Sequence, residues 1–518
     1  MIKIADWIDS LSFLKKALLS FALGALVAAS LAPLHLVFLL PISFSGLILI
    51  LGTAKNRKQA FFIGWWFAWG QFIAGLYWIG VAFTVDAATH ALLIPLPVLG
   101  LPAFLAIFSG LATLATHICG VKGIYRILVF SGFWILFEYV RGVIFTGFPW
   151  NLVGYSWTAF LPILQSTAFI GIYGLTLLTV LVSSLPALLM DKTVTRKISQ
   201  RAIIVGGSVI VLLFALGEWR LLSHPDTAFE DINLRIVQPN IPQAVKWIPE
   251  LRLGHLRKIV EMSAANNGLT PDHLIWPETA VPYYLAATPK LLEQLAEYVP
   301  EGGSIITGAP RRDHALGQYW NSLHVLEKTG KITGTYDKQH LVPYGEYMPF
   351  RDFMMATGLT QLIPALDQMS DFAVPDENAS RIIQPPGMPP ARAMICYEIA
   401  FPWEVAPDAD FSWILNVTND GWFGNTSGPY QHLAMTITRA VEQGVPVVRA
   451  ANTGISAVID PYGRIIAEIG LNKTDVIDSQ LPSSLEMKTL YARSGEYFTG
   501  FMVVILILFG AVMGRRGP

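Results

Sequence analysis

Cys396 lies in the stretch ARAMICYEIAFPWE, between a run of apolar residues and a Tyr-Glu pair. A thiolate can act as the nucleophile of acyl transfer, but the pKa of an ordinary thiol is about 8.5, so it needs a base or a cation nearby. Glu278 in DHLIWPETA could accept the proton, and Lys338 in GTYDK could stabilise both a thiolate and an oxyanion. A buried structural cysteine is the alternative interpretation.

These three residues need elements that bring them together, and residues 221–495 contain suitable patterns. Short apolar runs that end in polar or turn residues predict buried strands at 233–241, 272–280, 303–310, 391–398, 411–420 and 445–454. Helical patterns at 250–265 and 429–444 separate some of them, and 319–338 is typical of a hairpin. Alternating strands and helices predict an α/β domain, in which ligand sites lie beyond the carboxyl ends of strands. The three residues could therefore converge, although their spacing alone does not show it.

The flanking parts of the chain are far more apolar. The sequence is 53% hydrophobic and 14% charged, with a mean hydropathy of +0.48, whereas soluble proteins carry about 25% charged residues. Because a span needs about 20 apolar residues, the uncharged stretches predict eight membrane helices: two in 17–54 with a turn near Pro33, then 60–83, 92–119, 123–145, 161–189, 202–219 and 498–512. The first is interpreted as an uncleaved anchor. The expected domains are a seven-span membrane domain at 1–220, a catalytic domain at 221–495, and a final span with its tail at 496–518.

Lys and Arg in the short connections predict the orientation. One side holds Lys3, Lys15, Lys16, Lys55, Arg57, Lys58, Lys122, Arg126, Lys192, Arg196, Lys197, Arg201, Arg515 and Arg516. The connections near Pro33, Asp86 and Pro149 hold none. Both termini are therefore expected in the cytoplasm, and the 221–495 domain outside it. Cys119 then lies on the opposite side from Cys396, so Cys396 is expected to be a free thiol.

The motifs around the three residues resemble those of the nitrilase superfamily. They are WPETA with Glu278, YDKQHLVPYGEYMP with Lys338 and Glu346, ICYE with Cys396, and NDGWFG with Trp422. Together with the predicted spans, and with RGVIFTGFPWN at 141–151 and VQPNIPQAVKW at 237–247, the chain resembles the apolipoprotein N-acyltransferases over essentially its whole length. This resemblance implies a nitrilase-like α-β-β-α sandwich joined to eight membrane helices in a bacterial inner membrane, with the sandwich on the periplasmic side.

The resemblance also implies roles for individual residues. Cys396 matches the nucleophile, Glu278 the general base and Lys338 the oxyanion-stabilising lysine. Further matches are the supporting carboxylates Glu346 and Glu398, and the substrate-handling aromatic residues Trp247, Tyr397 and Trp422. The implied reaction is a ping-pong transfer from a phospholipid, typically phosphatidylethanolamine, to Cys396 as a thioester. The acyl chain then passes to the α-amino group of a diacylglyceryl-cysteine at an apolipoprotein N-terminus.

Several features of the sequence allow more than one interpretation. The apolar segment 354–369 predicts either core packing or a mobile arm that admits lipid. Glu138 and Arg141 predict either an ion pair or a contact between Arg141 and a lipid phosphate. Aromatic residues at 65–78 predict packing or an interface belt, with a lipid groove as the alternative. His340 and His432 are interpreted as core or surface residues.

Other kinds of site and function have less support. No metal-ligand spacing, phosphate-binding Gly loop or dinucleotide fingerprint occurs in the sequence, so neither a metal nor a cofactor is expected. The net charge of -1 gives no reason to expect a nucleic-acid partner. A membrane-tethered amidase that uses water as the acceptor is one alternative function. A transporter or scaffold with an inert outer domain is another, but the spans hold few ionisable residues and no repeat is evident.

Overall fold

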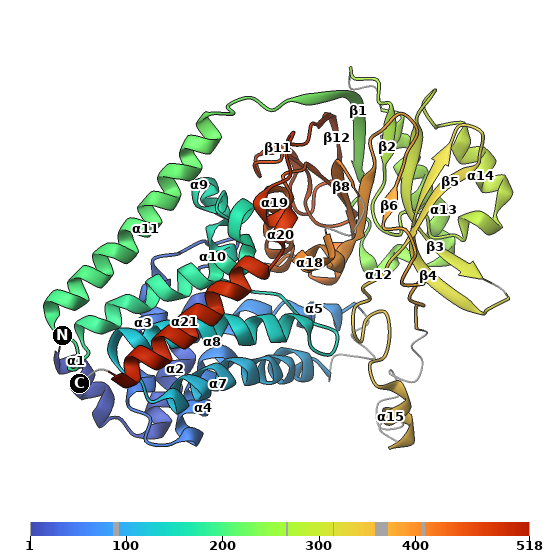
Figure 1. Ribbon diagram of the computed structural model, residues 1–518. Coiled ribbons are helices and arrows are strands. Elements are labelled where there is room, and N and C mark those ends of the chain that lie inside the picture. Colours follow the sequence, from blue (N-terminus) through green and yellow to red (C-terminus); the bar gives the residue numbers. More distant parts are fainter. Residues whose placement is uncertain are drawn as a thin grey trace. The chain divides into compact units, whose positions relative to one another are not determined.

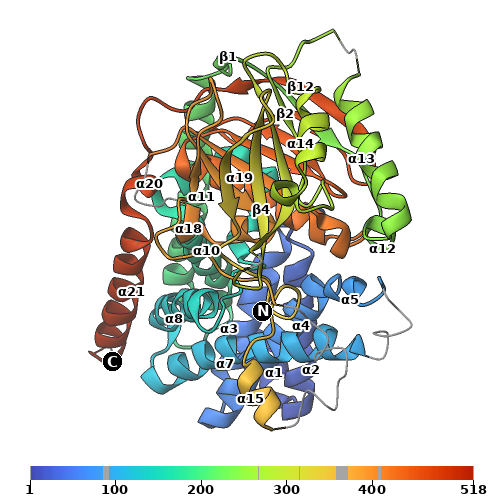
Figure 2. The ribbon, with the colours of Figure 1, turned by 90° about the vertical axis from the view of Figure 1, so that its right-hand side faces the viewer.

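A computed structural model describes residues 2–85, 93–265, 268–313, 315–357, 371–405 and 410–516 (Figure 1). The chain divides into two compact units. The first comprises Met1–Gly80, Leu93–Pro225 and Lys488–Pro518, and the second comprises Val81–Leu92 and Asp226–Met487. The first unit is built from helices, and the second from two sheets with helices outside them (Figures 1 and 2).

Most of the longer helices of the first unit follow the uncharged stretches of the sequence, whereas the helices at Ile2–Ser10 and Leu490–Ser494 contain charged residues. They are α1 (Ile2–Ser10), α2 (Phe13–Ala28), α3 (Leu39–Gly52), α4 (Arg57–Leu76), α7 (Leu101–Cys119), α8 (Gly123–Val143), α9 (Leu161–Leu164), α10 (Thr167–Ser184), α11 (Arg196–Leu222), α20 (Leu490–Ser494) and α21 (Tyr497–Arg516), and α5 (Ile79–Ala82) spans the boundary with the second unit. The predicted turn near Pro33 lies between α2 and α3. The predicted segment 161–189 is interrupted after α9, so it forms more than one helix.

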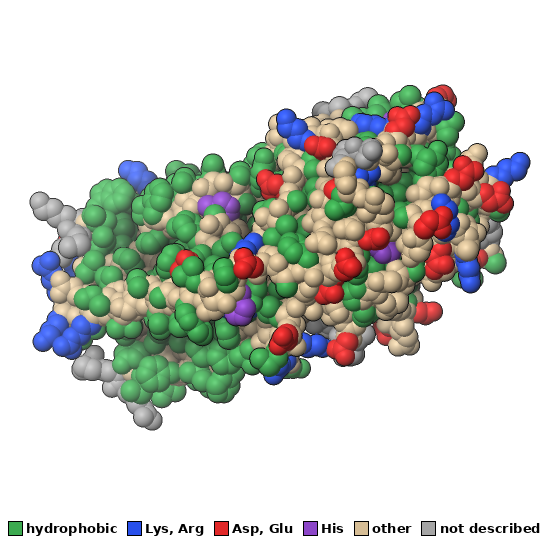
Figure 3. All heavy atoms as spheres, turned by 90° about the horizontal axis from the view of Figure 1, so that it is seen from above, with side chains coloured by type: hydrophobic (Ala, Val, Ile, Leu, Met, Phe, Trp, Pro, Cys, Tyr) green, Lys and Arg blue, Asp and Glu red, His purple; other side chains and the backbone are tan. Residues whose placement is uncertain are grey.

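Several of these helices have the length and composition of membrane spans. Within the described residues, five segments qualify: Leu96–Cys119, Gly123–Val143, Thr167–Leu189, Arg196–Leu222 and Tyr497–Arg515. They overlap five of the eight predicted stretches. The helices α2 and α3 are shorter, with 16 and 14 residues, and α4 does not qualify. Hydrophobic side chains cover much of this unit in Figure 3, with Lys and Arg near one end. The structure therefore contains a membrane part, and the number of eight spans stays a prediction.

Two interpretations left open for the apolar part can be compared with the structure. Glu138 and Arg141 of α8 form an ion pair, and both side chains are buried. Arg141 also donates a hydrogen bond to the carbonyl of Phe148, so the ion-pair interpretation is confirmed. The rings of Trp65 and Trp69 in α4 lie 5.1 Å apart between centroids, which agrees with the packing interpretation.

The strands of the second unit form two six-stranded sheets within its described residues. In spatial order, the first sheet contains β12 (Asp475–Pro482), β1 (Phe229–Gln238), β2 (His273–Ile275), β3 (Ser304–Asp313), β4 (Gln318–Glu327) and β5 (Ile332–Asp337). The second contains β11 (Ile465–Ile469), β10 (Ser456–Ile459), β9 (Val447–Ala451), β8 (Trp413–Thr418), β7 (Ala391–Ile395) and β6 (Ile382–Ile383). The strands β1, β2 and β3 are parallel, and so are β7, β8 and β9.

Successive side chains of a strand point to opposite faces of its sheet, so one face of each sheet can pack against the other sheet and the opposite face against helices. Leu234 and Ile236 of β1 join a core cluster with Ile395 and Leu415 of the second sheet. Val237 points the other way, into a cluster shared with α13 (Pro249–Ser263) and α14 (Pro289–Ala296). On the second sheet, α19 (Gly428–Gln443) packs against β9. The layer order is α-β-β-α, and the predicted α/β sandwich is confirmed.

The predicted strands correspond to β1, β2, β3, β7, β8 and β9, the hairpin to β4 and β5, and the two helices to α13 and α19. The strands β6, β10, β11 and β12 were not predicted from the sequence. The strands β6 and β10 have two and four residues, and β11 and β12 are partly exposed. Neither kind has the buried apolar run, ending in polar or turn residues, on which the strand predictions depended. Short helical elements complete the unit: α12 (Gln243–Lys246), α15 (Arg351–Ala356), α18 (Pro402–Val405) and the 3-10 turns η5 (Leu285–Ala287), η6 (Cys396–Ala400) and η7 (Asp420–Trp422).

Candidate active site

Glu278, Lys338 and Cys396 each follow the carboxyl end of a strand in the second unit. Glu278 lies just beyond β2, Lys338 directly follows β5, and Cys396 directly follows β7. All three are buried, with 7%, 1% and 7% of their surface exposed, respectively. The Lys338 ammonium lies 3.9 Å from Glu278 Oε1, and both charges act on the Cys396 thiol. The three residues therefore converge on one site.

Glu346 is the closest charged partner of Lys338. Its two carboxylate oxygens lie 2.9 and 2.8 Å from Lys338 Nζ, and one also accepts the backbone N–H of Val342 at 2.8 Å. Burial lowers the pKa of Lys338, but the charges of Glu346 and Glu278 outweigh it and raise that pKa above its ordinary value. Lys338 is therefore a permanent cation in the site.

Asn321 of β4 links the two carboxylates. Its Nδ2 donates to Glu278 Oε1 at 2.7 Å and lies 3.0 Å from Glu346 Oε1. Burial raises the pKa of Glu278, while the charge of Lys338 and the hydrogen bond from Asn321 lower it in part. The net rise makes Glu278 a stronger base than an exposed carboxylate. Asn321 is not among the predicted site residues, although a polar residue inside a buried hairpin strand is a usable signal.

Lys246 of α12 lies behind Glu278 and was also missed. Its ammonium is fully buried and donates to the carbonyl of Glu278 at 3.0 Å and to Thr279 Oγ1 at 2.6 Å. Burial lowers the pKa of Lys246 to about 8, against the opposing charges of Glu278 and Cys396. A second cation, whose charge changes near neutral pH, therefore acts on the site.

Cys396 occupies a sharp backbone turn. Its φ of +53° lies in the left-handed region, which is rare for a residue with a Cβ and clusters at functional sites. Burial and the charge of Glu278 raise the pKa of the Cys396 thiol, whereas Lys338 opposes that rise. The resting thiol is therefore protonated, and its activation requires transfer of that proton to a base.

Glu398 supports the same turn through its two oxygens. One accepts hydrogen bonds from the Tyr336 hydroxyl at 2.7 Å and from the backbone N–H groups of Gln339 at 2.8 Å and His340 at 3.1 Å. The other accepts the N–H of Ile395 at 2.6 Å. Glu398 thus joins the end of β7 to the segment that follows Lys338.

The three aromatic candidates have different surroundings. Trp247 and Trp422 are 40% and 42% exposed, and a hydrogen bond of 2.6 Å from Asn419 to Gln243 joins the neighbouring turns. Tyr397 is buried, with its ring 5.0 Å from that of Phe401. The two tryptophans can meet a ligand directly, whereas Tyr397 packs inside the unit.

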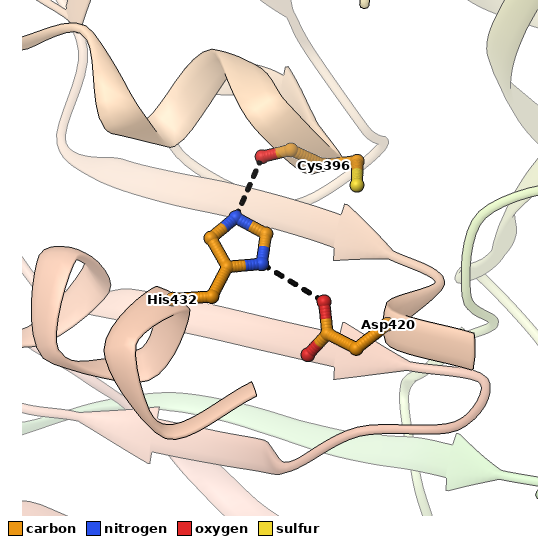
Figure 4. A group of neighbouring side chains, drawn as sticks. All are labelled: Cys396, Asp420 and His432. Atoms are coloured by element: carbon orange, nitrogen blue, oxygen red, sulfur yellow. Dashed lines mark hydrogen bonds and ion pairs between the residues drawn. The ribbon is translucent and has the colours of Figure 1, made fainter. Parts of the chain in front are cut away.

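His432, Asp420 and Arg449 form a buried group beside Cys396. His432 Nδ1 lies 2.8 Å from Asp420 Oδ1, and His432 Nε2 lies 3.1 Å from the carbonyl oxygen of Cys396 (Figure 4). Arg449 Nη2 donates to Asp420 Oδ2 at 2.7 Å. Burial would raise the pKa of Asp420, but Arg449 and His432 lower it, while burial and Arg449 lower that of His432. His432 is a core residue, as interpreted, but its ring also contacts the backbone of Cys396.

The same group has the donor types of a metal site. Ligand atoms of Cys396, Asp420 and His432 lie within 4.8 Å of one another, and thiolate, imidazole and carboxylate suit Zn²⁺. Nε2 of His432 already faces the carbonyl oxygen of Cys396, and Nδ1 lies within 3.1 Å of Asp420 and Arg449, so a metal ion would have to replace one of these contacts. The arrangement fits a hydrogen-bonded support better than a metal centre.

The apolar segment 354–369 is described only in part. Its first residues belong to α15, where Phe353 and Met355 are exposed, by 64% and 56%. The remainder, from residue 358, lies outside the described residues. Neither interpretation of this segment is decided.

Comparisons with known proteins match both units. Residues 23–185 match the apolipoprotein N-acyltransferase N-terminal domain, and residues 233–488 match the carbon-nitrogen hydrolase family. The apolipoprotein N-acyltransferase of Rhodopseudomonas palustris is 38% identical over 97% of this chain and 96% of its own. That of Brucella melitensis is 36% identical over 98% and 97%, respectively. A solved CN-hydrolase superfamily protein from Xanthomonas campestris is 18% identical, covers 49% of this chain and 91% of its own, and has a TM-score of 0.34. From the relatives that match its whole length, the chain belongs to the apolipoprotein N-acyltransferase family.

Proposed function

We propose that this protein transfers an acyl chain from a membrane phospholipid to the N-terminal amine of a diacylglyceryl-cysteine apolipoprotein, by a ping-pong reaction through a thioester on Cys396. The observation that carries the proposal is the convergence of the Cys396 thiol with Glu278 and the Lys338 ammonium, in a chain of this family. Phosphatidylethanolamine is the proposed donor.

In the first step, Cys396 Sγ attacks the ester carbonyl of the phospholipid while Glu278 accepts the thiol proton. Lys338, whose raised pKa keeps it charged, stabilises the oxyanion of the tetrahedral intermediate. The intermediate collapses by breaking the bond to the glycerol oxygen, which takes the proton from Glu278 and leaves as a lysophospholipid. The acyl chain remains on Cys396 as a thioester.

In the second step, the neutral amine of the apolipoprotein attacks the thioester carbonyl. Its surplus proton passes to Glu278 as the N–C bond forms, and Lys338 again stabilises the oxyanion. The C–S bond then breaks, and the departing thiolate takes the proton from Glu278, which restores the resting site. Protons and electron pairs balance without an oxidant, a reductant or a cofactor.

Supporting roles are proposed for five further residues. Glu346 holds Lys338 in place, and Glu398 holds the turn that carries Cys396. The exposed rings of Trp247 and Trp422 are proposed to contact the substrates, and Tyr397 to shape the site from inside. The hydrogen bonds of the two carboxylates support the first two roles.

We also propose the placement in the membrane. It consists of eight spans in the bacterial inner membrane, both termini in the cytoplasm, and the catalytic domain of residues 221–495 on the periplasmic side. The Lys and Arg bias of the short connections supports this placement. Alkaline phosphatase fused after residue 225 should be active and the same fusion after residue 122 inactive; the reverse pattern would contradict the orientation.

The chemical proposal is tested with purified protein and phospholipid labelled in its acyl chain. A hydroxylamine-labile acyl group should appear on Cys396 in the mass spectrum and be absent from Cys396→Ala. A diacylated lipopeptide should then remove the label and become N-acylated. Absence of the adduct, or its presence in Cys396→Ala, would contradict the thioester mechanism. Release of the label as free fatty acid, with no acylated peptide, would support a hydrolase instead.

A further inference from the structure

Beneath the turn of Cys396 lies a network of polar side chains that the proposed reaction does not use. Asp420, His432 and Arg449 come from η7, α19 and β9, and their side chains have 0% exposure. Burying ionised groups is costly unless each is paired. Here Asp420 has both His432 and Arg449 as partners, so the buried charges of the cluster are paired.

The contact between His432 and Cys396 has a defined direction. Figure 4 shows the carbonyl of Cys396, not its sulfur, toward the imidazole ring, with 3.1 Å between Nε2 and that oxygen. A carbonyl can only accept, so Nε2 carries a proton and donates it. His432 therefore holds the backbone of the nucleophile and does not act as the base of its thiol.

The other side of the ring is held as firmly. With the single proton of the neutral ring on Nε2, Nδ1 accepts a hydrogen bond from Arg449 Nη2 at 3.1 Å. Asp420 Oδ1 lies 2.8 Å from Nδ1 and is linked to the ring through Arg449, which also donates to Asp420 Oδ2 at 2.7 Å. Arg449 also donates to Asn416, whose amide donates to the carbonyl of Met394 in β7 at 3.2 Å. The network thus contacts the strand before the nucleophile and the peptide after it, which limits rotation of the turn between them.

The backbone conformation of Cys396 explains why its turn needs these contacts. A non-glycine residue at φ +53° persists only where its surroundings hold it. The orientation of its peptide sets where Sγ lies relative to Glu278 and Lys338, and small displacements of a reacting group cost about 10²-fold in rate. A donor at the Cys396 carbonyl therefore bears directly on the reactivity of the thiol.

We propose that His432, oriented by Asp420 and Arg449, is a positioning residue that holds the Cys396 carbonyl and so presents the thiol to Glu278 and Lys338. The inference rests on the proposed function of Cys396 as acyl carrier. It assigns His432 no contact with either substrate. Its effect should appear in the rate of thioester formation, with the KM for phospholipid unchanged.

Two substitutions of His432 distinguish the contact made by Nε2 from the contacts made by Nδ1. The amide nitrogen of glutamine is as many bonds from Cβ as Nε2, and that of asparagine as many as Nδ1. His432→Gln can therefore still donate to Cys396, whereas His432→Asn can contact only Asp420 and Arg449. Both are made in Cys119→Ala, which leaves Cys396 as the single thiol.

Two rates are measured in each variant: single-turnover thioester formation, and alkylation of Cys396 by iodoacetamide between pH 6 and 10. His432→Asn is expected to slow both by about 10²-fold, and His432→Gln to recover at least tenfold of the loss. Thermal unfolding in detergent is the control for folding.

The inference is overturned if His432→Asn reacts at the parental rate, or if both variants lose rate equally and in step with thermal stability. If the parental protein forms no thioester, the proposed function is wrong. The alkylation rates do not depend on the phospholipid reaction, so they still decide the role of His432 in that case.

Discussion

The side-chain amide of Asn321 donates a hydrogen bond of 2.7 Å to Glu278 Oε1. The backbone N–H of Lys338 donates to the carbonyl of the same asparagine at 2.8 Å. Asn321 therefore contacts both the proposed base and the proposed oxyanion-stabilising residue. Its amide favours the ionised form of Glu278, which is the form that accepts a proton.

Replacing Asn321 with leucine should move the acidic limb of the pH–rate profile to higher pH. The hydrogen bond lowers the pKa of Glu278, so its loss raises that pKa, by about 1–2 units for a bond to a charged group. Thioester formation should fall at low pH and recover at high pH. Asn378→Leu, at an exposed position, is the control, and an unshifted limb in Asn321→Leu would contradict the assignment of Glu278 as base.

Replacing Lys246 with methionine should slow alkylation of Cys396 at neutral pH, and the ratio of parental to variant rates should narrow at higher pH. The parental Lys246 has a pKa of about 8, so it is charged below that pH and favours the thiolate. Above it, the parental side chain is neutral as well. We expect a difference of about tenfold at pH 7, equivalent to one unit in the thiol pKa. Lys246→Arg stays charged, so its alkylation rate should show no break near pH 8. A ratio of parental to Lys246→Met rates that is the same at every pH would exclude a titrating Lys246 as the cause.

Glu398→Gln should destabilise the second unit. Four donors face the two oxygens of Glu398, and an amide must direct its NH₂ at one or more of them. A buried donor without an acceptor costs about 1–3 kcal/mol, which should lower the midpoint of thermal unfolding in detergent. Glu404→Gln, at a carboxylate that is 22% exposed and contacts His340, should have a smaller effect. Equal midpoints for the two variants would argue against the support role.

Single substitutions at the buried ion pair of α8 should cost more than the double substitution. Glu138→Leu leaves the charge of Arg141 buried without its partner, at a cost of about 3–5 kcal/mol. Glu138→Leu combined with Arg141→Met removes both charges and should recover most of that stability. Thermal unfolding in detergent of Glu138→Leu, Arg141→Met and the double variant measures the coupling. Additive losses would mean that Arg141 has another anionic partner, such as a lipid phosphate.

Local patterns in the sequence predicted much of the fold. Uncharged stretches became helices, the apolar runs became the strands that precede Glu278 and Cys396, and the predicted hairpin became the strand that precedes Lys338. The missed strands β11 and β12 are partly exposed, so their apolar residues do not form a continuous run. In the sandwich, such strands are specified by pairing with distant neighbours, as β12 pairs with β1, and no local window contains that information.

The sequence by itself determined the residue types of the site, their places at strand ends, and the separation of apolar and catalytic parts. These depend on hydrophobic periodicity and motif spacing, which are local. The tertiary structure decided which distant polar groups meet, such as Asn321 with Glu278, and His432 with the Cys396 carbonyl. Those contacts depend on strand order and on the packing of helices against sheets. A buried charge such as Arg449 within VVRAA signals that a partner exists, but only the folded chain shows that the partner is Asp420.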